Sequence, residues 1–294
     1  MQPCPKSNAL LQAKASMNKL LVVDGTNLLF QMFFGMPNKF THANGKGIWG
    51  VVGFVGALRK IISLVQPTHV VAIFDGEHCN PRCQVDQNYK ANRVDYSTVE
   101  DSENPFSQLD DVYKALGAMG IATFETTTCE TDDVVASYAK QLGKQMQIVV
   151  CSFDSDFFQL VTDNVCVLRY RGKQSQFFGI KEVQQRFGVH PQQYAHFKCL
   201  VGDSADNIRG IRGIGPKRAS QLLSTFGTLQ NIVENAHKIA NSALRGAILQ
   251  GQEQLQTNLQ LVELHGDEQL PFAIDQLVYT PSNKTTTQIL QEIM

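Results

Sequence analysis

The stretch Leu20-Leu21-Val22-Val23-Asp24-Gly25 is a short, uninterrupted apolar run that ends abruptly at an acid and a glycine. The same pattern returns in His69-Val70-Val71-Ala72-Ile73-Phe74-Asp75-Gly76 and in Gln147-Ile148-Val149-Val150-Cys151-Ser152-Phe153-Asp154. Short apolar runs rich in β-branched residues are typical of strands that are buried on both faces of a parallel sheet. The three runs therefore predict a parallel sheet whose strands each end close to an aspartate.

Helical periodicity fills the intervals between these runs, over Ile48–Val65, Gln108–Met119 and Asp132–Leu142. Alternation of strands and helices predicts an α/β fold with a twisted, doubly wound parallel sheet and flanking helices, over residues 19–178. After residue 178, short helical segments separated by glycine-rich turns predict a helical subdomain at 179–294. Residues 1–18 are a polar extension. The polar segment at about 77–105 is too long for an ordinary connection, so it is either disordered or a functional lid.

The composition excludes several classes of protein. The 294 residues are 43% hydrophobic and 18% charged, as expected of a folded globular protein. The 26 Lys+Arg against 27 Asp+Glu leave a net charge of −1, so the basic excess of many nucleic-acid binders is missing. No apolar run is long enough for a transmembrane helix, no secretory signal is evident, and the seven cysteines form no CxxC pair. We expect a cytoplasmic protein with no membrane partner.

Nine acids form the main candidate site. Asp24, Asp75 and Asp154 follow the three apolar runs directly, and ligands of open parallel sheets bind at the carboxyl ends of the strands. One such aspartate alone is usually a turn former, but three at equivalent positions indicate a site. The remaining acids lie in short clusters: Glu130, Asp132 and Asp133, then Asp156, then Asp203 and Asp206. The first of these clusters could instead stabilise the N-terminus of a helix by a favourable interaction with the helix dipole.

Carboxylates gathered this closely need cations, and oxygen-only ligands favour Mg²⁺ or Mn²⁺ over zinc. Two such ions would suit phosphodiester hydrolysis. Without the nine acids the chain has 18 acidic residues against 26 basic ones, so a basic surface could be masked by a concentrated acidic site.

A basic, glycine-rich turn follows in the helical part, at Ile211-Arg212-Gly213-Ile214-Gly215-Pro216-Lys217-Arg218. No acidic residue occurs between 207 and 233. One interpretation is a tight turn between two helices with a solvated face. The other is a site that binds a phosphate backbone without base readout, and bare backbone amides combined with positive charge favour this second interpretation.

Together these residues resemble the 5′-nuclease (flap endonuclease) family, which includes the N-terminal domain of bacterial DNA polymerase I and free-standing 5′–3′ exonucleases. Five ordered blocks within residues 19–265 carry the resemblance: Val23-Asp24-Gly25-Thr26-Asn27, Phe74-Asp75, Tyr89-Lys90-Ala91-Asn92-Arg93, Glu130-Thr131-Asp132-Asp133, and Gly202-Asp203 through Arg218. Because no polymerase domain follows, we expect a stand-alone, monomeric enzyme without a small-molecule cofactor.

The resemblance implies a PIN-like nuclease core, a helical arch at about 77–105 and a helix–three-turn–helix element in the C-terminal part. It also implies residue roles. For the first Mg²⁺ these are Asp24, Asp75, Glu130, Asp132 and Asp133; for the second, Asp154, Asp156, Asp203 and Asp206. The catalytic residues would be Lys90, Arg93, Asp132 and Asp133. DNA would contact Tyr89, Lys90, Arg93, Lys198, Arg209, Gly213, Gly215, Lys217 and Arg218, and backbone carbonyls of Ile211 and Ile214 would hold K⁺.

Three positions depart from the family pattern. Gln31 stands where many relatives have arginine, Thr131 replaces the usual alanine between the acids, and Phe153 occupies a position where a small residue is common. None of these changes removes an acid.

The sequence thus predicts a Mg²⁺-dependent 5′-nuclease that acts on DNA with a free 5′ end or a 5′ flap in replication or repair, with Mn²⁺ as a possible substitute metal. Two alternatives stay open: a PIN-like metal-dependent ribonuclease, and a non-catalytic protein that binds branched DNA.

Overall fold

The computed structural model describes residues 18–42, 45–76 and 81–293, so most of the polar N-terminal extension lies outside the described residues. One six-stranded sheet forms its centre, in the order β3-β2-β1-β4-β5-β6. The strands are β1 (Lys19–Asp24), β2 (His69–Phe74), β3 (Ala122–Glu125), β4 (Gln147–Cys151), β5 (Val165–Arg169) and β6 (Gln176–Phe178).

The first five strands are parallel, as predicted, but β6 runs antiparallel to β5. The predicted parallel sheet is confirmed for these five strands, and β6 adds one antiparallel strand at the edge. Only residues 170–175 connect β5 to β6, and a parallel pair needs a crossover connection of about a dozen residues or more.

The topology places a crevice at the carboxyl end of β1. Leu21 pairs with Val70 of β2 on one side and with Val149 of β4 on the other. The chain fills one half of the sheet from β1 to β3 and then crosses β1 to build the other half from β4. Such a switch point, where connections leave in opposite directions, is where open α/β sheets bind ligands.

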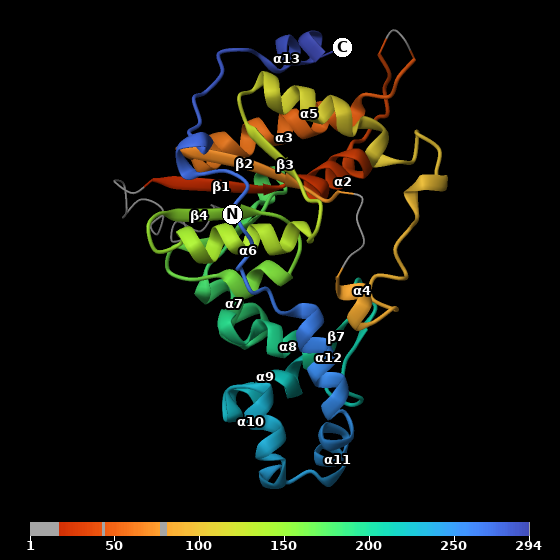
Figure 1. Ribbon diagram of the computed structural model, residues 1–294, viewed down its shortest axis with the longest axis vertical. Helices are drawn as coiled ribbons and strands as arrows, with labels where there is room; N and C mark the ends of the chain where they lie inside the picture. Colours follow the sequence, from red (N-terminus) through yellow and green to blue (C-terminus); the bar gives the residue numbers. More distant parts are fainter. Residues whose placement is uncertain (1–17, 43–44, 77–80, 294) are drawn as a thin grey trace.

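Alternate residues of the central strands enter two separate cores. Leu21 and Val23 pack with α2 (Gly25–Gly35), α3 (Trp49–Val65), α5 (Leu109–Ala118) and α13 (Thr286–Ile293) on one face. Leu20 and Val22 pack on the other face with α6 (Thr131–Leu142), in a core that continues into the C-terminal helices. Figure 1 shows α3 and α5 above the sheet and α6 below it. The predicted helices between the apolar runs are confirmed.

Helix α13 packs beside α5 above the sheet, whereas the C-terminal part at 180–262 is helical, as predicted, and forms the lower half of the molecule in Figure 1. Its helices are α7 (Ile180–Phe187), α8 (Tyr194–Val201), α9 (Pro216–Phe226), α10 (Leu229–Glu234), α11 (Ser242–Gln250) and α12 (Gln252–Val262). A small hairpin of β7 (Gly202–Asp203) and β8 (Ile208–Arg209) lies between α8 and α9.

The segment expected to form an arch is only partly helical. It contains α4 (Arg82–Val85) and the 3₁₀ turns η1 (Tyr96–Thr98) and η2 (Pro105–Gln108), with turns between them, while residues 77–80 lie outside the described part. Helix α4 packs against α12, and Figure 1 shows it near β7, away from the central sheet.

Over the described ranges, no helix has both the length and the apolar composition needed to cross a membrane. Five cysteines fall within these ranges, and all five are free thiols: Cys83, Cys129, Cys151, Cys166 and Cys199.

Candidate metal centre and nucleic-acid interface

Asp24 lies at the switch point of the sheet, between the ends of β1 and β4. Its Oδ1 accepts from the Asn27 backbone N–H at 3.0 Å, which caps helix α2. Its Oδ2 accepts from the Ser152 hydroxyl at 2.7 Å, across the β1–β4 crevice. Asp24 is only 5% exposed, and the two hydrogen bonds fix the orientation of its carboxylate at the carboxyl edge of the sheet.

Asp75 joins the end of β2 to the start of α6. Its Oδ1 accepts from the Thr131 backbone N–H at 3.0 Å, and its own N–H donates to the Thr26 hydroxyl at 2.9 Å. This bond brings Glu130 and Asp132, at the first turn of α6, to the same edge as Asp24.

Five of the nine predicted acids line one cavity of about 640 Å³ at this edge: Asp24, Asp75, Glu130, Asp132 and Asp154. Lys90 and Arg93 line it as well, and Phe30, Tyr96 and Phe106 form an aromatic wall. The sequence prediction that the strand-end acids converge agrees with this geometry.

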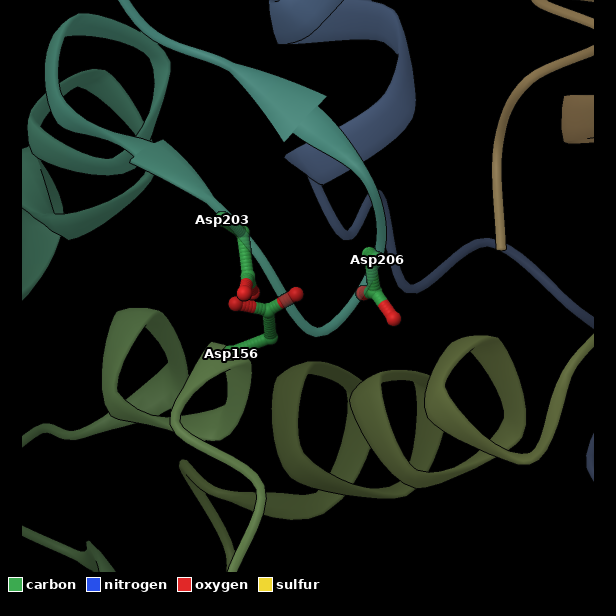
Figure 2. A group of neighbouring side chains, drawn as sticks. All are labelled: Asp156, Asp203 and Asp206. Atoms are coloured by element: carbon green, nitrogen blue, oxygen red, sulfur yellow. The ribbon is translucent and has the colours of Figure 1, made fainter. Parts of the chain in front are cut away.

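The second group of acids lies beside the first. Figure 2 shows Asp156 from the 3₁₀ turn η3 (Asp156–Leu160), Asp203 at the end of β7, and Asp206 in the turn toward β8. One carboxylate oxygen from each lies within 4.8 Å of the others. Asp154 links the two groups, because it lines the first cavity and its Oδ1 accepts from the Asp156 N–H at 2.8 Å.

Basic side chains meet these acids at short range. The Lys198 ammonium is buried and binds both Asp156 and Asp203. Arg93 donates to Asp206 Oδ1 at 2.7 Å, and Lys90 donates to Glu130. The acids are thus partly balanced by three of the cations that the sequence assigned to DNA.

Arg82 is a further cation at the site, and the sequence analysis did not identify it. Its guanidinium donates to Glu130 Oε2 at 2.5 Å and to both oxygens of Asp133, at 2.9 and 2.7 Å. Glu130 and Asp133 do lie on one helix face, as their spacing predicts, but Asp133 is not among the residues that line the cavity. Arg82 lies in a polar segment without periodicity, so no sequence pattern marks it.

The segment around Lys90 docks on the β7–β8 turn. The Lys90 N–H donates to the Asp206 carbonyl at 3.0 Å, and the Asn92 side chain donates to the Ser204 carbonyl at 2.9 Å. Lys90 itself has a left-handed backbone, with φ of 56°, which is unfavourable for a side chain of this kind. Docking fixes Lys90 and Arg93 between the two acidic groups.

Burial and mutual repulsion set the protonation of the acids. Burial, together with the nearby charge of Asp75, raises the pKa of Asp24 to about 7. Burial and the charge of Asp154 raise the pKa of Asp132 well above its usual range. Burial opposes the ionisation of Glu130, but Lys90 and Arg82 outweigh it and lower its pKa. Carboxylates that repel one another in this way attract a divalent cation.

Lys198 keeps its charge in this setting. Burial alone would lower its pKa, but Asp156, Asp154 and Asp203 outweigh burial and raise it. The side chain is 4% exposed, so the structure places it within the acidic site and not on an outer surface. Tyr89 is similarly buried, and its hydroxyl donates to Glu130 Oε2 at 3.1 Å.

The glycine-rich turn lies at the start of α9, far down the helical part. Gly213 has φ of 84°, the Ile214 N–H donates to the Ile211 carbonyl at 2.9 Å, and Arg218 donates to the Gly213 carbonyl at 2.6 Å. Arg209, Lys217 and Gly215 are exposed around it. The turn borders a cavity of about 520 Å³ between α9 and α11.

The positions that depart from the family pattern hold structural contacts. Gln31 donates from Nε2 to the Tyr170 carbonyl at 2.7 Å, which ties α2 to the β5–β6 connection. The Phe153 N–H donates to Asn27 Oδ1 at 3.0 Å, so the backbone of the loop is anchored directly before Asp154. The Thr131 N–H binds Asp75, while its hydroxyl oxygen is buried without a hydrogen-bond partner.

Comparison with known proteins identifies the family. Residues 19–188 match the family model described as 5′-3′ exonuclease, N-terminal resolvase-like domain, and residues 189–285 match 5′-3′ exonuclease, C-terminal SAM fold. The chain belongs to the 5′-3′ exonuclease family. A curated relative, the 5′-3′ exonuclease of Aquifex aeolicus, is 29% identical over 280 residues, which cover 94% of this chain and 92% of that protein.

Family members of different length match as well. DNA polymerase I of Rhizobium leguminosarum is 33% identical over 272 residues, which cover 90% of this chain. The match spans only 26% of that polymerase. The chain likewise spans only 29% of DNA polymerase I of Thermus filiformis and 31% of that of Thermus thermophilus.

Solved structures share the fold. The T5 5′-exonuclease with bound divalent zinc has a TM-score of 0.70 at 22% identity, covering 94% of this chain and 98% of that one. The bacteriophage T5 D15 flap endonuclease in complex with DNA and metal ions gives the same values, and the catalytic core of Rad2 with DNA gives 0.58 at 16% identity. These confirm the PIN-like nuclease fold that the sequence resemblance implied.

Proposed function

We propose that this protein is a Mg²⁺-dependent 5′-nuclease that hydrolyses phosphodiesters of DNA at a free 5′ end or a 5′ flap. The observation that carries the proposal is the convergence of eight carboxylates, from three strand ends, one helix start and the β7–β8 turn, on one edge of the sheet. The solved neighbours with this fold include nucleases bound to DNA and to divalent metal ions, which supports the proposal.

The donor set suits two hard divalent cations. Asp24, Asp75, Glu130 and Asp132 would hold one, and Asp156, Asp203 and Asp206 the other, with Asp154 between them. Every donor is a carboxylate oxygen, which is the chemistry that Mg²⁺ and Mn²⁺ prefer. When bound, such ions supply Lewis acidity and a water of lowered pKa for in-line displacement at phosphorus.

Lys90 and Arg93 would bind the scissile phosphate. In the structure they are held by Glu130 and Asp206, and both line the cavity. Binding of cations to the acids would free the two side chains to face the non-bridging phosphate oxygens, where they would stabilise negative charge. Phe30, Tyr96 and Phe106 form an apolar wall beside this position.

Lys198, by contrast, would act on the acids and not on DNA. Buried between Asp156 and Asp203, it forms an ion pair with each and so holds both carboxylates in place. A cation bound at Asp156 or Asp203 would compensate the charge of that carboxylate and weaken its ion pair with Lys198. Through Lys198, metal binding would therefore affect the position of the β7–β8 turn.

The turn at 211–218 would hold duplex DNA at a distance from the acids. Arg209, Lys217 and Arg218 supply charge there, and the backbone at Gly213 and Gly215 is exposed. Carbonyls of Ile211 and Ile214 would hold K⁺, whose positive charge would add to the attraction of the turn for phosphate. Contacts of this kind bind the backbone without reading the sequence.

A flap-cleavage assay tests the proposal. A 5′-labelled DNA flap, incubated with Mg²⁺, is expected to release a short 5′ product that EDTA abolishes and that Asp132→Asn reduces by at least a hundredfold. Asp163→Asn, an exposed acid at the opposite edge of the sheet, serves as the matched control and keeps full activity.

Three outcomes would overturn the proposal. Undiminished cleavage by Asp132→Asn would show that the acids are not the catalytic centre. Cleavage of an RNA flap with no cleavage of the matched DNA flap would instead assign a ribonuclease. Tight DNA binding by wild type and Asp132→Asn without cleavage in Mg²⁺ or Mn²⁺ would assign a non-catalytic binding protein.

A further inference from the structure

A third cavity, of about 560 Å³, lies beside the β5–β6 hairpin and is lined by four basic residues: Arg169, Arg171, Lys173 and Arg186. The other lining residues are Phe153 and the polar Gln174, Ser175 and Gln176, so no acid faces the cavity. Within the described ranges, none of the four basic residues forms an ion pair with a carboxylate. This cavity is called the basic pocket below.

Aromatic rings hold these cations in place of counter-charges. The Arg169 guanidinium lies 4.7 Å from the centre of the Phe158 ring, and Arg171 lies 4.9 Å from that of Phe153. Arg186 lies 5.7 Å from the centre of the Phe178 ring. Contacts with ring faces orient a guanidinium but leave its charge uncompensated, so the hydrogen-bond donors of Arg171 and Arg186 stay available to an anion.

Electrostatics in the pocket agree with this arrangement. Burial lowers the pKa of Arg169, and the charges of Arg186 and Arg171 lower it further. The Nε of Arg169 is buried and has no hydrogen-bond partner, while its Nη2 donates to the Phe153 carbonyl at 2.8 Å. Asp154 of the acidic cavity partly opposes this lowering, but no acid is among the described lining residues of the pocket, so its like charges favour a multiply negative ligand.

The basic pocket shares a wall with the acidic cavity. Phe153 lines the basic pocket, its N–H binds Asn27 of the acidic cavity, and its chain neighbour Asp154 lines that cavity. Helix α2 adds a second connection, because Gln31 binds the Tyr170 carbonyl directly before Arg171. The acidic cavity and the basic pocket are therefore adjacent across the loop at 152–154.

We propose that the basic pocket binds a backbone phosphate of the DNA strand that extends from the acidic site. The inference rests on the proposed function for its ligand. Guanidinium groups match phosphate oxygens through paired N–H donors, and the pocket offers few groups that could read a base edge. It supplies affinity common to every DNA sequence.

Binding measurements in EDTA test the pocket without cleavage. The variant Arg171→Gln/Lys173→Gln removes two exposed cations from the pocket, and Lys60→Gln/Lys144→Gln removes two exposed cations at the opposite edge of the sheet as a matched control. We expect the pocket variant to reduce the exponent of salt dependence by about one, because one phosphate contact is lost. Its affinity for a labelled flap DNA would then fall about fourfold less than that of wild type between 50 and 200 mM salt.

Methylphosphonate scanning locates the phosphate. One phosphate at a time is made neutral along the flap DNA, and we expect one or two positions whose neutralisation weakens wild type but not the pocket variant. A pocket variant with the salt exponent of wild type, or a scan in which both proteins respond alike at every position, would overturn the inference.

The same proteins separate this inference from the proposed function. Loss of Mg²⁺-dependent cleavage with the predicted change in salt exponent would remove the proposed function and leave the pocket standing. Cleavage by wild type with no effect of the pocket variant on KM or binding would remove the pocket alone.

Discussion

Asp24→Asn is expected to stabilise the metal-free protein, although it removes a proposed metal ligand. Asp24 is buried, and its pKa is raised from 3.8 to about 7. The folded state therefore holds this proton more tightly than the unfolded state does, and the free energy of unfolding falls as the pH rises from about 4 to about 7. The full shift corresponds to about 4 kcal/mol above pH 7.

An asparagine has the same shape but carries no charge to desolvate. Loss of the charge-assisted hydrogen bonds from Asn27 and Ser152 would offset about 1–2 kcal/mol of the gain. We therefore expect Asp24→Asn to raise the free energy of unfolding by about 2–3 kcal/mol at pH 8 in EDTA. Below pH 4 the gain disappears, because Asp24 of the wild type is then protonated in both states.

Urea unfolding followed by circular dichroism, in EDTA at several pH values from 4 to 8, measures the difference. Asp163→Asn, at an exposed position before β5, controls for the loss of one negative charge. Addition of Mg²⁺ should stabilise wild type more than the variant, because a ligand that binds only the folded state shifts its stability. Equal or lower stability of Asp24→Asn at pH 8 in EDTA would refute the argument from burial.

Other variants test the remaining contacts. Lys198→Met leaves the buried Asp156 and the half-buried Asp203 without their ammonium. We therefore expect a loss of about 3 kcal/mol in EDTA by urea unfolding, partly restored by Mg²⁺, and full stability would contradict this. Arg82→Met removes the guanidinium that orients Glu130, so we expect Mn²⁺ binding measured by calorimetry to weaken at least about tenfold. An unchanged Mn²⁺ affinity would show that Arg82 does not orient this ligand. Gly202 has φ of 87°, and Gly202→Ala would place a Cβ 2.4 Å from the Gly210 nitrogen, so we expect the free energy of unfolding to fall by about 3 kcal/mol or more. Gly56→Ala, at a position of helix α3 where a Cβ meets no atom within 4 Å, should not destabilise the protein.

The central strands could be predicted from the sequence because they are buried on both faces and therefore uniformly apolar. β1, β2 and β4 have this property, and the aspartates after them mark the edge where the site forms. β3 was not predicted, because its four residues are only partly buried and carry polar side chains. β6 was missed for a related reason, since it is a three-residue edge strand with an exposed start.

The site was predictable where chain neighbours share a role and less so where the fold joins distant residues. The acids could be found as clusters, but Arg82 binds Glu130 across 48 positions of the chain and has no local signal. Ser152 and Asn27 orient the loops at the switch point, yet each is an ordinary turn residue in sequence. The basic pocket likewise needs the hairpin to bring Arg186 to Arg169, and the ring contacts that hold them are set by tertiary packing.

Two groups of carboxylates at the carboxyl edge of the sheet are proposed to hold two catalytic divalent cations. Anomalous diffraction from crystals grown with Mn²⁺ tests this proposal most directly. We predict two peaks, one bounded by Asp24, Asp75, Glu130 and Asp132 and the other by Asp156, Asp203 and Asp206, with the Lys198 ammonium displaced from at least one of its acids. Crystals in saturating Mn²⁺ that show no anomalous peak among these carboxylates would contradict the account.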